Sequence, residues 1–562
     1  MLAARISRAG AVVAIAVGLA VATAVTPPAL AADPGPTSVA IIAPIVAPPG
    51  TTGLLDSTLL EQYTAPEGLL TRQLDAVIGR PVTLAIDPMI VASIRVLGAG
   101  APVAASDWLA RLEAAPNESF LLAYADADVA LALEAGSAGV PAPQSFEFVI
   151  DPAQFAPETT ATPSPSPSPT EDGGMPGLPS LDELLAWDAT FDSIVWPRGG
   201  AVGTASLDAL TASGFVRVIL SSANVTRDPS LGAAVTIGDQ AVVVTDDAVS
   251  TALSAAATSL SPLDLDAALP AVHAAIAAAG SVQAGQGVVV AHLDRAVALS
   301  GSNVAQTISA LQVDDAVRLV PLSEALAAST SGEASLVEGH ADPDRVQVVR
   351  SLLGAEADEQ RFATIAADPA RLTSPRRLAL LALLDIAWAD NTAGWATATD
   401  EFLTTSVDIR ESVQIVTASP FTLLADTATL PIPVSNSLNQ AVTVYVTVRP
   451  ETAQLAVTDS LVELTIEPNS QGKASIPVQA ISNGTVQVLM TLSGASGVSV
   501  GQPAITEINV QAGWETPIVL VIGGLVVAVF AIGLVRNIVR RRRTAAISAT
   551  ADGEPGAAGS DD

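Results

Sequence analysis

An uncharged stretch near the C-terminus constrains this chain more than any other feature. Residues 518–535 read IVLVIGGLVVAVFAIGLV, without a charged side chain. As an α-helix this stretch reaches roughly 27 Å, enough to cross the hydrocarbon core of a bilayer. Because positive flanks remain in the cytoplasm, the sequence predicts one transmembrane helix at 518–535, a cytoplasmic, disordered tail at 536–562 and an extracytoplasmic remainder. The flanking cations that set this orientation are Arg536, Arg540, Arg541, Arg542 and Arg543.

The N-terminus has the pattern of a secretory signal. Arg5 and Arg8 precede an apolar run at 11–25, and Ala29-Leu30-Ala31 supplies the small residues that signal peptidase needs. An uncleaved anchor is the alternative, but Pro27-Pro28 and the cleavage site favour a signal peptide at 1–31. The chain is therefore expected to be a single-pass type I protein of the cell membrane, with a large N-terminal domain outside.

Composition limits the classes of protein that remain. A chain of 562 residues is too long for one hydrophobic core, so several domains are expected. It contains no cysteine, which excludes disulfides and thiolate metal sites. The formal net charge of −32 disfavours binding to nucleic acid.

Residues 38–330 alternate between short apolar runs and helical patterns. Runs that are apolar at successive positions are typical of parallel strands buried on both faces. Their repetition indicates a (β/α) barrel-like domain rather than a doubly wound sheet. A Pro/Ser-rich insertion at 157–179 interrupts it as an extended linker. The predicted strands are 39–45, 82–87, 120–126, 193–196, 215–220, 241–244, 287–292 and 317–320.

Two further modules follow before the membrane segment. Residues 331–411 have a helical pattern, and residues 412–512 change to alternation with a period of two. Short alternating strands separated by turn residues favour an immunoglobulin-like β-sandwich, which would stand next to the membrane as a spacer. The predicted strands of this sandwich are 413–416, 430–434, 442–448, 461–466, 474–478, 486–492 and 505–510.

Functional groups of a parallel barrel gather where its strands end. The candidate catalytic carboxylates at these positions are Asp87, Asp126, Asp128 and Asp294. Paired carboxylates can hydrolyse glycosidic bonds when they lie roughly 5–10 Å apart. Tyr124 and Trp196 are the candidate ligand-binding residues, and Tyr124 would share one face of the third strand with Asp126.

Each of these residues also has a structural interpretation. Asp87 precedes Pro88, and Asp128 precedes an apolar helical run, as helix N-caps do. Trp196 could be an ordinary buried tryptophan. The three histidines, His273, His292 and His340, form no HxxxH or HExxH frame, so neither a metal site nor a cofactor is expected.

Several motifs carry a resemblance to a known family. They are Leu84-Ala-Ile-Asp87-Pro88, Tyr124-Ala-Asp126-Ala-Asp128, Val195-Trp196-Pro197, the segment LPIPVSNSLNQ at 430–440 and the terminal span with its arginines. Together they resemble an actinobacterial single-span envelope family of unknown function, typically encoded beside the lipid II flippase. The resemblance implies a cell-wall setting and no established activity. The barrel is also distantly similar to polysaccharide deacetylases, whose HxxxH metal frame is missing here.

Three hypotheses of function follow. The leading one is a membrane-anchored, non-catalytic factor that binds a cell-wall glycan or precursor, or an envelope-assembly membrane protein. The second is a carbohydrate-active hydrolase, either a glycoside hydrolase or deacetylase-like, that uses carboxylates at the barrel mouth. The third is a purely structural spacer, which a barrel mouth filled by side chains would favour.

Overall fold

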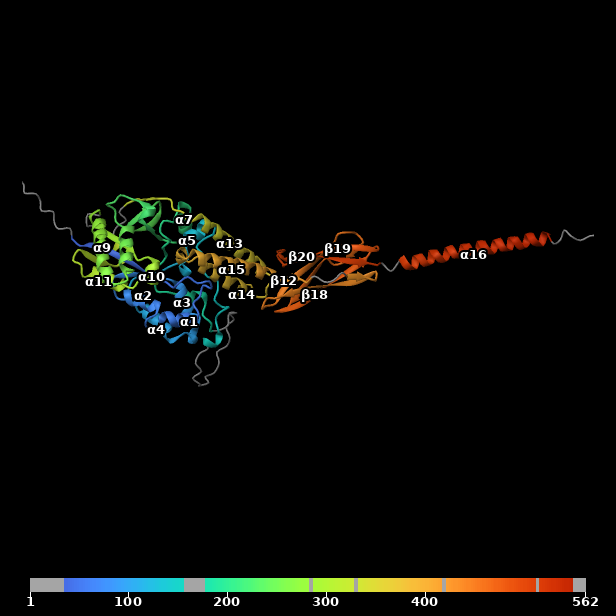
Figure 1. Cartoon of the computed structure of the whole chain (residues 1–562), viewed down its shortest axis with the longest axis horizontal. Helices are drawn as coiled ribbons and strands as arrows, with labels where there is room; N and C mark the ends of the chain where they lie inside the picture. Colours follow the sequence, from blue (N-terminus) through green and yellow to red (C-terminus); the bar gives the residue numbers. More distant parts are fainter. Residues whose placement is uncertain are drawn as a thin grey trace, which may run out of the picture.

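The computed structural model describes residues 35–155, 177–282, 287–327, 332–416, 421–511 and 515–548. The predicted signal peptide, most of the Pro/Ser-rich insertion and the end of the predicted tail lie outside these residues. Along the chain, the described parts form an α/β domain, a helical segment, a two-sheet β domain and a final long helix. Figure 1 shows them following one another along a single long axis.

A nine-stranded sheet forms the centre of the α/β domain. Its hydrogen-bonded path runs β3-β2-β1-β9-β8-β5-β4 and is parallel throughout. β10 pairs in parallel with the start of β1, and β7 pairs antiparallel with β8. All eight predicted strands coincide with strands of this sheet, and β7 is additional. The strands are β1 Thr37–Ile45, β2 Val82–Ile86, β3 Ser119–Leu121, β4 Ile194–Val195, β5 Arg217–Ser221, β7 Ala234–Ile237, β8 Gln240–Thr245, β9 Val288–His292 and β10 Val317–Val320.

The two ends of this strand path lie next to each other. β3 and β4 are in contact, and the Phe191 N–H donates to the Ser119 carbonyl oxygen of β3 at 3.1 Å. No ladder pair joins β3 to β4 within the described part of the chain. One buried cluster contains side chains from all eight parallel strands, with Ala40, Ile42 and Phe120 among its members. The sheet therefore encloses a core of its own.

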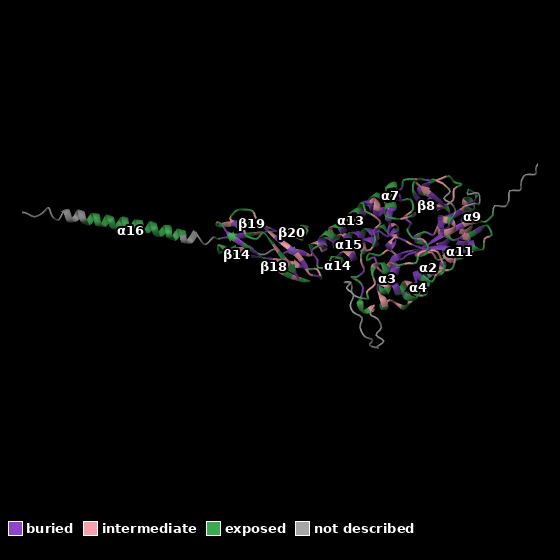
Figure 2. Ribbon diagram, turned by 180° about the vertical axis from the view of Figure 1, so that it is seen from behind, coloured by how far each residue is buried: buried purple, intermediate pink, exposed green. Residues whose placement is uncertain are grey.

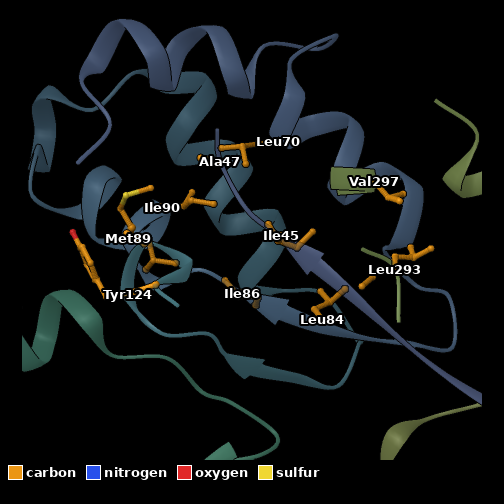
Figure 3. Packing of buried hydrophobic residues seen from close by; sticks show 14 of the residues in the cluster. Ile45, Ala47, Leu70, Leu84, Ile86, Met89, Ile90, Tyr124, Leu293 and Val297 are labelled. Atoms are coloured by element: carbon orange, nitrogen blue, oxygen red, sulfur yellow. The ribbon is translucent and has the colours of Figure 1, made fainter. Parts of the chain in front are cut away.

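Helices pack against the other face of the sheet. Alternate residues of β1, such as Ile41 and Ile45, point to this second core. Figure 3 shows Ile45, Leu84 and Ile86 of the strands facing Leu70 of α2 and Ile90 of α3. The helices of this domain are α1 Ser57–Thr64, α2 Leu69–Val77, α3 Pro88–Arg95, α4 Val103–Glu113, α5 Val129–Glu134, α6 Leu181–Leu185, α7 Thr204–Ala212, α8 Asp247–Ala257, α9 Pro262–Val282, α10 Arg295–Ser300, α11 Val304–Gln312 and α12 Leu322–Ala327.

Shorter elements complete the α/β domain. Strands β6 (Val225–Thr226) and β11 (Ser335–Leu336) form a small antiparallel sheet. The 3-10 turns are η1 Gly98–Gly100, η2 Tyr124–Asp126, η3 Pro152–Gln154 and η4 Ser222–Asn224.

The helical segment packs directly on the α/β domain. It consists of α13 (Pro343–Ala363), α14 (Ala370–Leu383), the 3-10 turn η5 (Ile386–Asp390) and α15 (Thr392–Glu411). α13 contacts α5, and α14 contacts η2. Gly53, at φ +70°, lies against α14 so closely that a Cβ would stand 2.2 Å from the Leu378 carbonyl oxygen. Only glycine fits this approach.

Two sheets with a shared core form the β domain. Alternating inward positions such as Val444, Val446 and Val448 are buried. The seven predicted strands are all present, and β13 and β16 are additional. One sheet has the order β12-β14-β18-β16 and the other β13-β20-β19-β15-β17. The strands are β12 Val413–Ile415, β13 Phe421–Leu423, β14 Thr427–Asn436, β15 Val442–Pro450, β16 Leu455–Val457, β17 Leu461–Ile466, β18 Ser470–Ala480, β19 Gly484–Ser493 and β20 Ser499–Val510.

The last helix, α16 (Glu515–Ser548), extends from the β domain away from the α/β domain (Figure 1). Its apolar part from Ile518 is exposed along its length (Figure 2). Two described helices, α9 and α16, are long and apolar enough to cross a membrane. α9 packs against α8, β1 and β9, so it belongs to the α/β domain. α16 is therefore the candidate membrane anchor.

Candidate functional site

The predicted polar residues lie at the edge where the parallel strands end. Asp87 comes directly after β2, and Asp126 and Asp128 follow β3. Trp196 comes directly after β4, and His292 is the last residue of β9. Since these strands run parallel in one sheet, the residues that follow them lie along the same edge.

Arg295, at the start of α10, links these groups. Its Nε lies 3.1 Å from Asp126 Oδ2, and its Nη2 lies 3.3 Å from Asp126 Oδ1. Nη2 also donates to the Trp196 carbonyl oxygen at 3.1 Å, and the guanidinium carbon stands 3.6 Å from the centre of the Trp196 ring. The Trp196 ring also packs on the His292 ring in a T-shaped arrangement, with 5.1 Å between ring centres. The side chains of Arg295 and Asp126 are only 8% and 5% exposed, so they form a buried ion pair.

Asp87 has a structural role that its sequence position predicts. Its Oδ1 accepts from the Met89 N–H at the start of α3 and from the Ala125 N–H, both at 2.9 Å. The N-cap interpretation of Asp87 is therefore confirmed. Complete burial, with the nearby charge of Asp126 as a smaller contribution, raises the pKa of Asp87 to about 8.

Asp128 caps α5 in the same way. Its Oδ1 accepts from the Leu131 N–H at 3.1 Å, which confirms its N-cap interpretation as well. Burial raises the pKa of Asp128. The hydrogen bond from the Leu131 N–H opposes that rise most, followed by the charges of Arg345 and Arg198. Arg345, from the first turn of α13, also lies over the Trp395 ring at 4.9 Å.

A fourth buried acid, Asp385, comes from the helical segment. Its backbone forms an antiparallel bridge with Ala127, and the Asp128 N–H donates to the Leu384 carbonyl oxygen at 2.7 Å. Burial and the charge of Asp126 raise the pKa of Asp385 well above its usual value. We call Asp87, Asp126, Asp128, Asp385 and Arg295 the acidic cluster.

The backbone at this cluster differs from the prediction. The predicted third strand reached Asp126, but β3 ends at Leu121 and Tyr124–Asp126 form the turn η2. Ala125 and Asp126 have φ values of 57° and 41°, the left-handed conformation that non-glycine residues rarely adopt. Tyr124 and Asp126 therefore do not share a strand face. The turn directs the Asp126 carboxylate to Arg295 and allows the Ala125 N–H to bond Asp87.

The remaining predicted residues have different positions. Tyr124 is 4% exposed and its hydroxyl donates to the Gly53 carbonyl oxygen at 2.7 Å. Trp196 is 6% exposed and is covered by Arg295 and His292. Asp294 is exposed and caps α10 through the Ala296 N–H at 2.8 Å. Asp294 therefore lies outside the acidic cluster, although it is adjacent to Arg295 in sequence.

The acidic cluster is closed to solvent. Counted as whole residues, backbone included, its four acids are at most 4% exposed, and Leu384 and Asp385 lie directly against the turn after β3. A carboxyl group with a pKa near 8 holds a proton at neutral pH and could serve as a general acid. A substrate would first have to displace the helical segment from these positions. Among the described residues, no three acidic or histidine side chains gather as metal ligands.

These features define a multi-domain protein with a closed acidic cluster in its α/β domain and an exposed apolar helix at its C-terminal end. The chain belongs to DUF6049, a family of unknown function whose model matches residues 6–555. No curated protein matches the chain significantly.

Several solved structures are similar to less than a fifth of the chain. E. coli alpha-2-macroglobulin in its native conformation matches at 22% identity and a TM-score of 0.15, covering 18% of this chain and 7% of that one. WR4, a C. elegans MSP family member, matches at 8% identity and a TM-score of 0.14, covering 18% of this chain and 99% of that one. The cupredoxin domain of amoB from Nitrosocaldus yellowstonii matches at 13% identity and a TM-score of 0.14, covering 17% and 86%. Overlaps of this size do not bear on function.

Proposed function

We propose that this protein is a membrane-anchored, extracytoplasmic and non-catalytic binding factor of the cell envelope. In this proposal α16 spans the membrane, and its arginines keep the tail in the cytoplasm. The α/β domain is an incomplete (β/α) barrel, and the β domain is an immunoglobulin-like spacer that holds it away from the lipid. The binding partner is a cell-wall glycan or precursor, or a membrane protein of envelope assembly.

The closed acidic cluster is the observation that carries the non-catalytic part of the proposal. Glycoside hydrolysis needs two carboxylates on either side of a bound substrate. Here Asp126 is held by Arg295, while Asp87 and Asp128 accept hydrogen bonds from helix N-termini. The helical segment lies over them through Leu384 and Asp385. These contacts favour a stabilising role for the acids over the hydrolase alternative.

The envelope setting rests on the exposed helix and on predictions from the sequence. The exposed apolar helix α16, the predicted signal peptide and the resemblance to an actinobacterial envelope family encoded beside the lipid II flippase support it. A pure spacer would not need an enclosed α/β domain. We therefore favour a binding role over the purely structural one.

The test measures binding and turnover together. Detergent-solubilised full-length protein is incubated with isolated cell-wall glycan strands, and membranes are probed for proteins that co-purify with it. We expect retention of the glycan or recovery of an envelope-assembly protein, without release of new reducing ends or acetate. If wild type releases reducing ends or acetate and Asp87→Asn or Asp126→Asn abolishes that release, the hydrolase hypothesis is established instead. If the protein neither binds glycan nor co-purifies with an envelope-assembly protein, only the spacer hypothesis remains.

A further inference from the structure

A groove crosses the surface of the α/β domain away from the acidic cluster. Two cavities of about 410 and 440 Å³ adjoin there, and they share Arg95 and Glu113 as lining residues. The first lies between α3, α4 and α6, and the second lies beside Trp187 and Asp188. Each has the volume of a ligand pocket. Together the two cavities have the volume for two connected chemical groups.

The junction between the two cavities is held rigidly. Arg95, the last residue of α3, forms a 2.9 Å ion pair with Glu113 at the end of α4. Its Nη1 also donates to the Leu184 and Ala186 carbonyl oxygens, at 3.2 and 2.5 Å. One guanidinium thus connects three helices. The side chains of Arg95 and Glu113 remain 24% and 46% exposed, so a ligand can reach both.

Trp187 gives the second cavity an oriented aromatic ring. Its Nε1 donates to Ser119 Oγ at 3.2 Å, which fixes the indole against β3. The residue is only partly buried and lines the cavity next to the exposed Asp188. In the first cavity, a second partly exposed ring, Phe155, and the side chain of Leu109 both line the wall. Both cavities therefore combine an aromatic surface with carboxylate oxygens, of which Glu183 Oε2 already accepts from Ser180 in the capping box of α6.

We propose that this groove binds an uncharged saccharide of at least two sugar units. A pyranose ring has an apolar C–H face that packs on an aromatic ring and a rim of hydroxyl groups that donate to carboxylates. The lining has three carboxylates, Glu113, Glu183 and Asp188, against the one guanidinium of Arg95. This excess of negative charge disfavours phosphates, nucleotides and anionic headgroups. The two adjoining cavities match two linked sugar rings.

This inference rests on the proposed function, because it names the glycan class and the site that binds it. The test titrates detergent-solubilised full-length protein with chitotetraose, and separately with cellotetraose, by calorimetry. Trp187→Ala should weaken the affinity at least about tenfold, as loss of an aromatic anchor does. Glu113→Gln should weaken it about threefold or more, while Trp187→Phe should retain most of it.

A matched control and the outcomes complete the test. Asp107 is an exposed acid on α4, the helix that carries Glu113, but it does not line the groove. Asp107→Asn should therefore leave binding unchanged. Equal binding by wild type, Trp187→Ala and Glu113→Gln overturns the groove but leaves the proposed function standing. Failure of wild type to bind either saccharide, or binding of a lysine-rich peptide instead, also overturns it. If no saccharide binds but a membrane protein of envelope assembly co-purifies, the proposed function stands without the saccharide groove.

Discussion

At the scale of single residues, burial in the acidic cluster opposes ionisation of the carboxyl groups. Burial raises the pKa of Asp87 from 3.8 to about 8. Because the folded chain binds this proton more tightly than the unfolded chain, the contribution of Asp87 to stability is largest below pH 3.8. It is lost progressively as the pH rises toward 8. Each unit of pKa difference corresponds to about 1.4 kcal/mol.

The variant Asp87→Asn tests this linkage. Asparagine keeps an oxygen that can accept from the Met89 and Ala125 amides, but it cannot ionise. We expect the variant to be more stable relative to wild type at pH 8 than at pH 5, measured as Tm at both values. Asp294→Asn, an exposed N-cap, is the control. An equal difference in Tm between wild type and Asp87→Asn at the two pH values would contradict the role of burial.

Removing Arg295 should have a large effect on stability. Arg295→Met leaves the Asp126 carboxylate buried without its ion partner, and breaking such a pair costs about 3–5 kcal/mol. Denaturant unfolding measures this loss. Arg217→Met, a partly exposed arginine at the start of β5, should cost much less. The double variant Asp126→Asn with Arg295→Met should recover part of the stability, and the absence of recovery would argue against the pair.

The sequence indicates only part of this cluster. Asp87, Asp126 and Asp128 are identifiable because each follows an apolar strand and precedes a helix or turn. Arg295 is 169 residues from Asp126, and Asp385 belongs to a separate helical pattern, so no local signal joins them. Burial of Tyr124 and Trp196 is also not visible in sequence, because it depends on Gly53, Arg295 and the helical segment.

At the scale of elements, the turn η2 is the most strained feature of the candidate site. Ala125 has a φ of 57°, which costs an L-residue with a Cβ about 1 kcal/mol. Ala125→Gly should therefore be neutral or stabilise the protein by up to about 1 kcal/mol. Ala130→Gly, on helix α5, should destabilise it by about 1 kcal/mol. Thermal unfolding compares the two variants. Equal destabilisation by Ala125→Gly and Ala130→Gly would contradict the claim that the backbone is strained at Ala125.

Prediction of elements from the sequence succeeds where the pattern is long. Continuous apolar runs locate the eight parallel strands, and alternation locates seven strands of the β domain. The sequence analysis misses β13 and β16, each three residues long, because so short a run has no measurable period. It extends β3 to Asp126 because the residues up to Tyr124 are apolar, and backbone φ values do not appear in such a pattern.

At the scale of the whole molecule, the order of the parts fits the proposed function, in which the α/β domain acts at a distance from the membrane. The α/β domain and the helical segment lie at one end, the β domain follows, and α16 lies at the other (Figure 1). The α/β domain is held to the helical segment by buried contacts at the acidic cluster. The proposed saccharide groove lies on the α/β domain, between α3, α4 and α6.

The absence of cysteine allows a direct test of this arrangement. Single cysteines are placed at Ala267 on α9, at Ala453 in the β domain and at Ser560 in the tail, and intact cells are treated with a membrane-impermeant maleimide. We predict labelling at Ala267→Cys and Ala453→Cys in intact cells, and at Ser560→Cys only after permeabilisation. Labelling of Ser560→Cys in intact cells, or protection of the other two, would contradict an extracytoplasmic protein anchored by α16.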